Sequence, residues 1–232
     1  MNPKAIRYAA LAGAAGAALS AGGCATSGTA DTAQAPAATT APATSSASPT
    51  PASDAKPEGW RAVATDQDRE RIRNWYSAWK EAHESVAAGG YTAQALKEGA
   101  LLRADAALPN PHLPPGQYRC RTIKLGSKGG STLTYVAYPF FRCEVRAEQN
   151  IFSFRKLTGS QRPSGLIFDD NDRRQIFLGT EALGDETGNI DYGVDKSRDR
   201  AALVERIGPN RWRLVFPYPA FESIVDVMEI VP

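Results

Sequence analysis

The spacing of hydrophobic residues first indicates helices. Between Thr65 and Gly90, apolar side chains recur every three or four residues and form one stripe: Ile72, Trp75, Trp79, Ala82 and Val86. This spacing predicts an amphipathic helix with Thr65 as its N-cap and Gly89–Gly90 at its end. A second helix is predicted over Ala93–Arg103, capped by Thr92. The following LPNPHLPPG stretch excludes regular structure.

After Gly116 the pattern changes to alternation and short apolar runs, which predict β-strands. We expect nine of them, at Gln117–Leu125, Thr132–Tyr138, Phe140–Ala147, Ile151–Lys156, Gly165–Asp169, Arg174–Leu178, Ala202–Ile207, Arg211–Phe216 and Ile224–Val231. Short connections favour antiparallel neighbours, and one long polar loop runs from Thr180 to Arg200. The predicted class is α+β and mainly β. An N-terminal helical segment would pack on an antiparallel β-barrel or strongly curved sheet, lipocalin-like by analogy.

The N-terminus has the pattern of an export signal. Two basic residues, Lys4 and Arg7, precede an apolar stretch over residues 8–19, which is too short to span a bilayer. The sequence AGGC that ends at Cys24 resembles a bacterial lipobox, although Ala21 stands where Leu is usual, so ordinary signal-peptidase cleavage stays open. We expect residues 1–23 to be removed and Cys24 to be acylated. Ala25, rather than Asp, favours the outer membrane, with the domain facing the periplasm.

Composition divides the rest of the chain. Residues 24–57 are mainly Ala, Thr, Ser and Pro, and we expect a disordered linker there. Residues 58–232 are predicted to form a single globular domain, helical over 65–103 and β over 117–232. The expected contact with the membrane is the lipid, and the domain is expected to be a monomer.

Charge and cysteine usage exclude several classes. The chain has 27 Lys and Arg against 25 Asp and Glu. Cleavage before Cys24 removes two basic residues and no acidic ones, so the mature chain is neutral and nucleic acid is not an expected partner. In an oxidising periplasm, Cys120 and Cys143 are expected to form a disulfide. They lack C-x-x-C spacing, and the two histidines do not complete a zinc site, so no metal is expected.

Several segments resemble a known family. They are GQYRCRTIKLG, KLTGSQRPSG, IFLGT, YGVDKSRD, VERIGPNRWRLVFPYP and DVMEIVP, with the earlier DRERIRNWYSAW and KEGALL. In this order they resemble the domain of unknown function 4893 family of bacterial exported proteins and predicted lipoproteins. The resemblance covers most of residues 60–232. It implies a secreted single domain and supplies no activity, cofactor or catalytic residue.

Candidate chemistry is sparse. There is no G-x-S-x-G beside a histidine and no Gly-rich phosphate loop, so we expect no cofactor and identify no catalytic residue. The carboxylates of the long loop are interleaved with basic residues, which favours a salt-bridged surface over a glycosidase pair. The most suggestive polar set is Arg119, Arg121, Arg162, Arg206, Tyr192 and Asp199. It is interpreted either as an ion-pair network, with Asp199 or Glu205 as partners of inward-facing arginines, or as a pocket for an anion or carboxylate.

The sequence therefore favours a non-enzymatic, lipid-anchored binding module for a small molecule or envelope component. Such a module predicts a defined internal pocket. Two alternatives stay open. A protein-interaction or inhibitor-type accessory lipoprotein predicts a filled barrel and a functional exposed loop. A periplasmic hydrolase requires paired carboxylates in a cleft.

Overall fold

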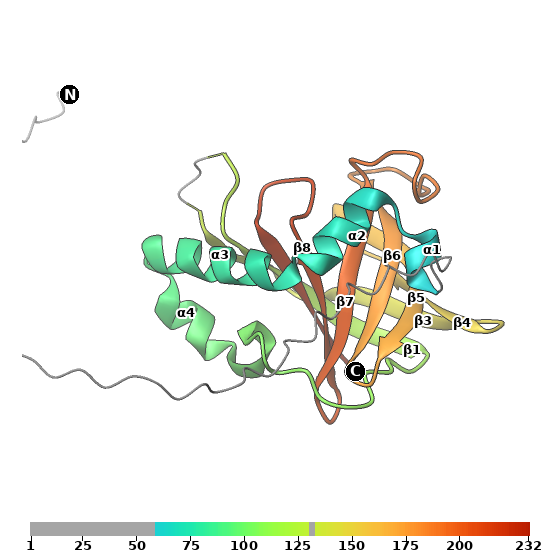
Figure 1. Cartoon of the computed structure of the whole chain (residues 1–232), viewed down its shortest axis with the longest axis horizontal. Coiled ribbons are helices and arrows are strands. Elements are labelled where there is room, and N and C mark those ends of the chain that lie inside the picture. The colour runs from blue at the N-terminus through green and yellow to red at the C-terminus, as the bar shows by residue number, and fades with distance from the viewer. Residues whose placement is uncertain (1–58, 130–132) are drawn as a thin grey trace, which may run out of the picture. The chain divides into compact units, whose positions relative to one another are not determined.

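The computed structural model describes residues 59–129 and 133–232 (Figure 1). The signal peptide, Cys24 and the linker lie outside these residues, so their assignments stay predictions. In the described part of the chain, no helix is both long and apolar enough to cross a bilayer.

The N-terminal segment forms short helices rather than two longer ones. They are α1 (Trp60–Val63), α2 (Asp66–Arg73), α3 (Trp75–Ala88), α4 (Thr92–Lys97) and the 3-10 helix η1 (Gly99–Leu102). The first predicted helix is divided at Asn74, whose φ of −92° and ψ of 14° depart from helical geometry. The predicted N-cap is confirmed, because the Thr65 hydroxyl accepts a hydrogen bond from the Asp68 backbone N–H.

The second predicted helix also needs correction. Thr92 is the first residue of α4 and makes no capping hydrogen bond; Tyr91 occupies the N-cap position. The α-helix ends at Lys97, because Gly99 adopts a φ of +58°, a left-handed conformation that stops the regular helix. The chain continues as one turn of 3-10 helix.

Nine strands follow in the described residues, and all nine lie where the hydrophobic pattern predicts a strand. They are β1 (Gly116–Leu125), β2 (Tyr135–Ala137), β3 (Phe141–Glu148), β4 (Ile151–Lys156), β5 (Gln161–Asn171), β6 (Arg174–Leu183), β7 (Asp199–Gly208), β8 (Arg211–Pro217) and β9 (Val225–Val231). Strands β3 to β9 pair consecutively and antiparallel, and β1 pairs with both β3 and β9. The result is an eight-strand antiparallel barrel, with β2 added beside the second half of β1.

The long loop is shorter than predicted. Strand β6 continues to Leu183 and β7 begins at Asp199, so the connection covers residues 184–198. Both strands end in polar residues, so the sequence did not indicate that these ends pair. In the structure, Thr180 of β6 pairs with Asp199 of β7. We call residues 184–198 the β6–β7 loop.

Two apolar layers stabilise the domain. One fills the barrel with inward-facing side chains, including Phe154, Phe177, Trp212, Leu214 and Phe216. The other lies between the outer barrel wall and the helices, where α2 packs against β7 and α3 against β1, β8 and β9 (Figure 1). The strands of this covered wall are mainly apolar on both faces, as expected for strands buried on both sides.

The disulfide lies inside the barrel. Cys120 on β1 and Cys143 on β3 are bonded, fully buried, and have Cα atoms 5.9 Å apart. The two strands are spatial neighbours but do not form a simple hairpin, since β2 lies between them in the chain.

Two facing glycines allow the barrel wall to bend. Gly165 on β5 pairs with Gly179 on β6. A Cβ atom on Gly165 would lie 2.2 Å from the Leu178 carbonyl oxygen, and one on Gly179 would lie 2.2 Å from that of Ser164. Backbone this close excludes any side chain at either position.

Candidate functional site

The four arginines of the predicted binding set do not meet. Because Cys120 faces the interior, its neighbours Arg119 and Arg121 face outward, which corrects the inward orientation considered above. Arg119 donates to the Pro232 carbonyl, 3.3 Å away. The Arg121 guanidinium lies between the carboxylates of Glu98 and Glu229, with N–O distances of 2.5 Å to each. Neither Asp199 nor Glu205 is its partner.

The other two arginines hold loop backbone. Arg162 donates to the carbonyl oxygens of Gly159, Gly184 and Glu186, at 2.6–2.7 Å. Arg206 donates to the carbonyl oxygens of Pro109 and Asn110. Both therefore organise the connections at the barrel ends.

Tyr192 and Asp199 join the β6–β7 loop to α2. The Tyr192 hydroxyl donates to the Asp68 carboxylate at 2.7 Å, and Asp68 also pairs with Arg71 at 2.7 Å. Asp199 accepts a hydrogen bond from the Gly193 N–H, and burial raises the pKa of its carboxyl group. These contacts anchor the loop. Its acidic side chains also serve the loop, since Glu186 forms two hydrogen bonds with Arg198.

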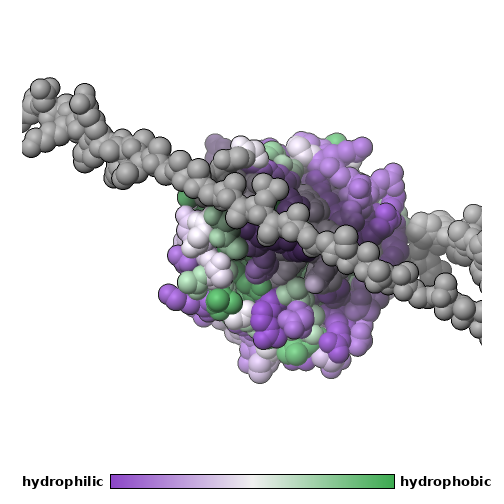
Figure 2. All heavy atoms as spheres, turned by 60° about the vertical axis from the view of Figure 1, so that its left-hand side comes forward, coloured by the Kyte–Doolittle hydropathy of each residue, from purple (hydrophilic) through white to green (hydrophobic). Residues whose placement is uncertain are grey.

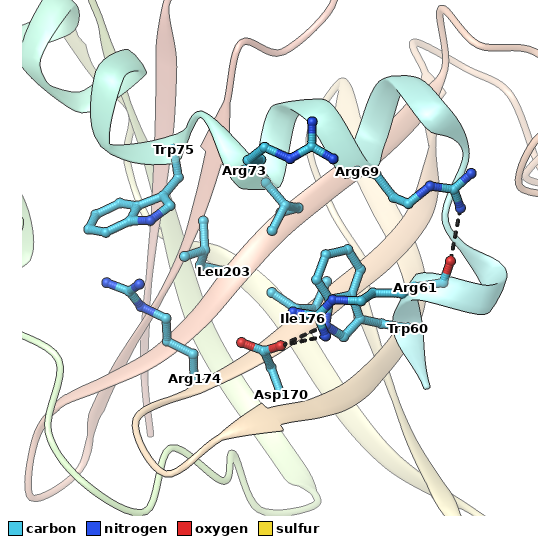
Figure 3. A pocket seen from close by; sticks show the side chains of 10 residues that line it. Trp60, Arg61, Arg69, Arg73, Trp75, Asp170, Arg174, Ile176 and Leu203 are labelled. Atoms are coloured by element: carbon cyan, nitrogen blue, oxygen red, sulfur yellow. Dashed lines mark hydrogen bonds and ion pairs between the residues drawn. The ribbon is translucent and has the colours of Figure 1, made fainter. Parts of the chain in front are cut away.

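The more favourable site lies between the helices and the outer barrel wall. We call it the helix groove, and its volume is about 300 Å³. Helices α1 to α3 form one side and strands β5 to β7 the other (Figure 3). The lining consists of Trp60, Arg61, Arg69, Ile72, Arg73, Trp75, Asp170, Arg174, Ile176 and Leu203.

A tryptophan and an arginine stand at each end of this groove. At one end, the Trp60 indole N–H donates to Asp170 at 2.7 Å, and Arg61 stacks 4.3 Å from the Trp60 ring. At the other end, Arg174 lies 3.9 Å from the centre of the Trp75 ring. Ile176 and Leu203 form an apolar floor between the two ends (Figure 3).

Arginines dominate the charged side chains of the groove. Four guanidinium groups line it against one carboxylate, that of Asp170. Three of the arginines are engaged: Arg61 pairs with Asp170, Arg69 with Asp66 and Arg174 with Glu205. Arg73 is exposed and contacts no hydrogen-bond or ionic partner among the described residues. Its five N–H donors are therefore free for a ligand.

This arrangement can hold an anion that carries a flat apolar portion. A free guanidinium matches carboxylate, sulfonate and phosphate groups, while indole rings and aliphatic side chains accept an apolar surface. The described residues contain no cluster of three His, Cys, Asp or Glu side chains with metal-binding geometry.

Sequence reasoning did not identify these groove residues. One signal was present, because Arg69 and Arg73 are four positions apart and so share a helix face. Arg174 lies on a strand more than 100 positions downstream, and only the barrel topology places it beside Trp75. The sequence also favoured core packing for Trp75. This side chain is half-buried and packs against the core, and Arg174 stacks on its ring.

Figure 2 shows hydrophilic side chains over much of the face that it presents, with hydrophobic side chains in smaller groups.

A family model described as domain of unknown function (DUF4893) matches residues 60–230, so the chain belongs to this family, as its motifs predicted. No curated protein and no solved structure matches the chain.

Proposed function

We propose that this domain is a non-enzymatic binding module that holds a small organic anion in the helix groove, on a chain anchored to the cell envelope through Cys24. The anion would carry a flat apolar portion. The observation that carries the proposal is Arg73, a free guanidinium beside an apolar floor bounded by two tryptophans.

The size of the groove limits the ligand. About 300 Å³ is at the lower end of the range found for small-molecule sites, roughly 300–1,000 Å³. A ligand of one or two rings with one acidic group fits this volume. The acidic group would contact Arg73, and the rings would cover Ile176 and Leu203.

The barrel interior does not offer a comparable site. Aromatic side chains and the disulfide fill most of it. A polar cavity at one end has a volume of only about 20 Å³. The ligand is therefore assigned to the groove rather than to the lumen.

The test is calorimetric titration of the mature chain with 2-naphthoate and with its neutral analogue 2-naphthamide. We expect the carboxylate to bind and the amide to bind at least about tenfold more weakly, because a hydrogen bond to a charged group contributes roughly 1.5–3 kcal/mol. Arg73→Gln should remove this difference. Arg146→Gln is the matched control, since Arg146 is an exposed arginine on β3 with its side chain 56% exposed.

Equal binding of acid and amide, or no binding of either, would refute the proposal. Native mass spectrometry of the protein purified from a periplasm provides a second readout. A co-purifying mass that is lost on denaturation, and absent from Arg73→Gln, would identify the natural ligand.

A protein-interaction role is the second candidate. It is favoured by the filled barrel and by apolar side chains exposed near the β6–β7 loop, where Val63, Leu166 and Ile190 line a shallow groove. Photo-crosslinking from position 190 in cells tests it, with exposed Leu96 on α4 as the control position. A single crosslinked protein at 190 that is absent at 96 supports this role, whereas matching patterns exclude it.

A further inference from the structure

Helix α2 lines a second groove on the side opposite to the helix groove. The residues that it contributes there follow the i, i+3, i+4, i+7 spacing of a single helix face, and the last is its C-cap: Gln67, Glu70, Arg71 and Asn74. We call this groove the polar groove, and its volume is about 590 Å³. The two grooves share no lining residue, so α2 separates them.

Three connections between strands form the rest of the polar groove. The β6–β7 loop contributes Lys196, the β1–β2 connection contributes Lys128, and the β8–β9 connection contributes Tyr218 and Pro219. The antiparallel strand order brings all three connections to the same end of the barrel (Figure 1). Segments that are far apart in the sequence therefore meet beside one face of α2.

Hydrogen bonds hold these connections in place. Lys128 donates through its backbone N–H to the Glu222 carbonyl oxygen at 2.7 Å, and through its ammonium to the Pro219 carbonyl oxygen. The Tyr218 hydroxyl donates to Glu81 on α3 at 2.9 Å. Tyr218 also has a φ of +46°, a left-handed conformation that non-glycine residues keep where the surrounding structure fixes it, as at many ligand sites. A ligand would therefore meet a preformed groove, which lowers the cost of binding.

Several side chains on this fixed frame have no partner. Within the described residues, four of those that line the groove form no hydrogen bond and no ion pair: Gln67, Glu70, Asn74 and Lys196. They carry amide, carboxylate and ammonium groups. The groove therefore offers both donors and acceptors to a ligand.

The charges around the groove balance. Arg71 is already paired with Asp68, at 2.7 Å. The ammonium groups of Lys128 and Lys196 are matched by the carboxylate of Glu70 and by that of Glu81, which holds Tyr218. These groups favour an uncharged ligand whose own polar groups both donate and accept hydrogen bonds, which is the chemistry of hydroxyl groups.

We propose that the polar groove binds a neutral saccharide. Its hydroxyl groups would donate to Glu70 and accept from Lys196, and others would bond to the amides of Gln67 and Asn74. Tyr218 and Pro219 supply apolar surface for the C–H face of a sugar ring. The volume lies within the range of small-molecule sites, roughly 300–1,000 Å³, and is about twice that of the helix groove.

The test is capture of the mature chain on an array of immobilised neutral, carboxylated and phosphorylated glycans, at low and at high salt. We expect neutral glycans to retain the protein equally at both, because salt screens attraction between charges and these ligands carry none. In calorimetric titration with the captured glycan, Glu70→Ala combined with Lys196→Ala should weaken binding at least about tenfold, the effect of losing hydrogen bonds to both side chains.

The matched control is Lys80→Ala combined with Glu84→Ala. It removes the same two charges from an exposed pair on α3 and should leave glycan binding unchanged. An excess of 2-naphthoate should not displace the glycan, because the two grooves share no lining residue.

An array on which no neutral glycan retains the protein would overturn the proposal. So would capture that is limited to charged glycans and lost at high salt, displacement of the glycan by 2-naphthoate, or binding that Glu70→Ala with Lys196→Ala leaves intact.

Discussion

Arg213 provides the sharpest test of how the helices are held on the barrel. This side chain is fully buried between the wall and the helical segment. It forms two hydrogen bonds with Glu205, at 2.6 and 2.8 Å, and its Nη1 donates to the carbonyl oxygens of Ala100, Leu101 and Arg103. One guanidinium thus joins β8 to β7 and to η1.

We expect Arg213→Met to lower the free energy of unfolding by about 3–5 kcal/mol, the usual effect of removing one partner of a buried ion pair. Glu205 would keep Arg174 as its remaining cation, at 2.7 Å, which favours the lower part of this range. The carbonyl oxygens that lose Arg213 would be left buried without this donor, which favours the upper part. For a domain of this size, the change corresponds to a Tm lower by about 6–20 °C.

The assay is urea unfolding followed by far-ultraviolet circular dichroism, with Tm measured in parallel. Arg211→Met is the matched control on the same strand, because Arg211 pairs with Glu229 while 31% exposed. Its partner Glu229 is buried but keeps Arg121, 2.5 Å away, so we expect Arg211→Met to cost no more than about 1 kcal/mol. If both variants lost less than about 1 kcal/mol, the buried network would not be what holds the helical segment in place.

Four further predictions concern separate parts of the chain. Replacing Cys120 and Cys143 together by Ser should lower the free energy of unfolding by about 3 kcal/mol relative to the oxidised protein. The reason is that the disulfide closes a loop between two residues 23 positions apart and so restricts the unfolded chain. Gly165→Ala should destabilise by about 1–3 kcal/mol or more in urea unfolding, since its Cβ would overlap backbone. Cys24→Ser should abolish metabolic labelling with palmitate, and labelling that persists would refute the lipid anchor. Because burial lowers the pKa of Lys156 to about 8, against 10.5 in the unfolded chain, stability should rise with pH between these values. Glu181, Asp226, Lys124 and Arg162 face this group, and Lys156→Met should remove the rise.

Strand positions were predictable because alternation is a local signal. Trp212, Leu214 and Phe216 alternate with residues of the outer wall, and the strand they predict is β8. Strand ends were less predictable. Glu181 and Arg200 are polar, and the sequence predicted that they lie in a loop. In the structure they face the lumen and pair with each other inside the barrel. A buried ion pair has no signature in hydropathy, so the polar end of the lumen could not be recognised from the sequence.

The helix break at Asn74 had a similar cause. The apolar stripe continues through it, from Ile72 to Trp79, and therefore predicts one helix. In the structure the break changes the direction in which α2 and α3 lie on the wall. Arg73, the last residue of α2, lines the groove, whereas Trp79 on α3 packs in the core.

The position of the helix groove follows from the way the barrel is filled. An eight-strand barrel has room inside for side chains and little else, and here aromatic rings and the disulfide occupy most of that room. The cavity at the polar end has a volume of only about 20 Å³. A larger ligand must therefore bind outside the barrel, where the helices do not cover the barrel wall completely. The helix groove is such a place, with Trp60 and Trp75 at its two ends and Ile176 and Leu203 on the wall between them. If Trp75 closes one end of the groove in this way, Trp75→Ala should impair naphthoate binding as strongly as Arg73→Gln does.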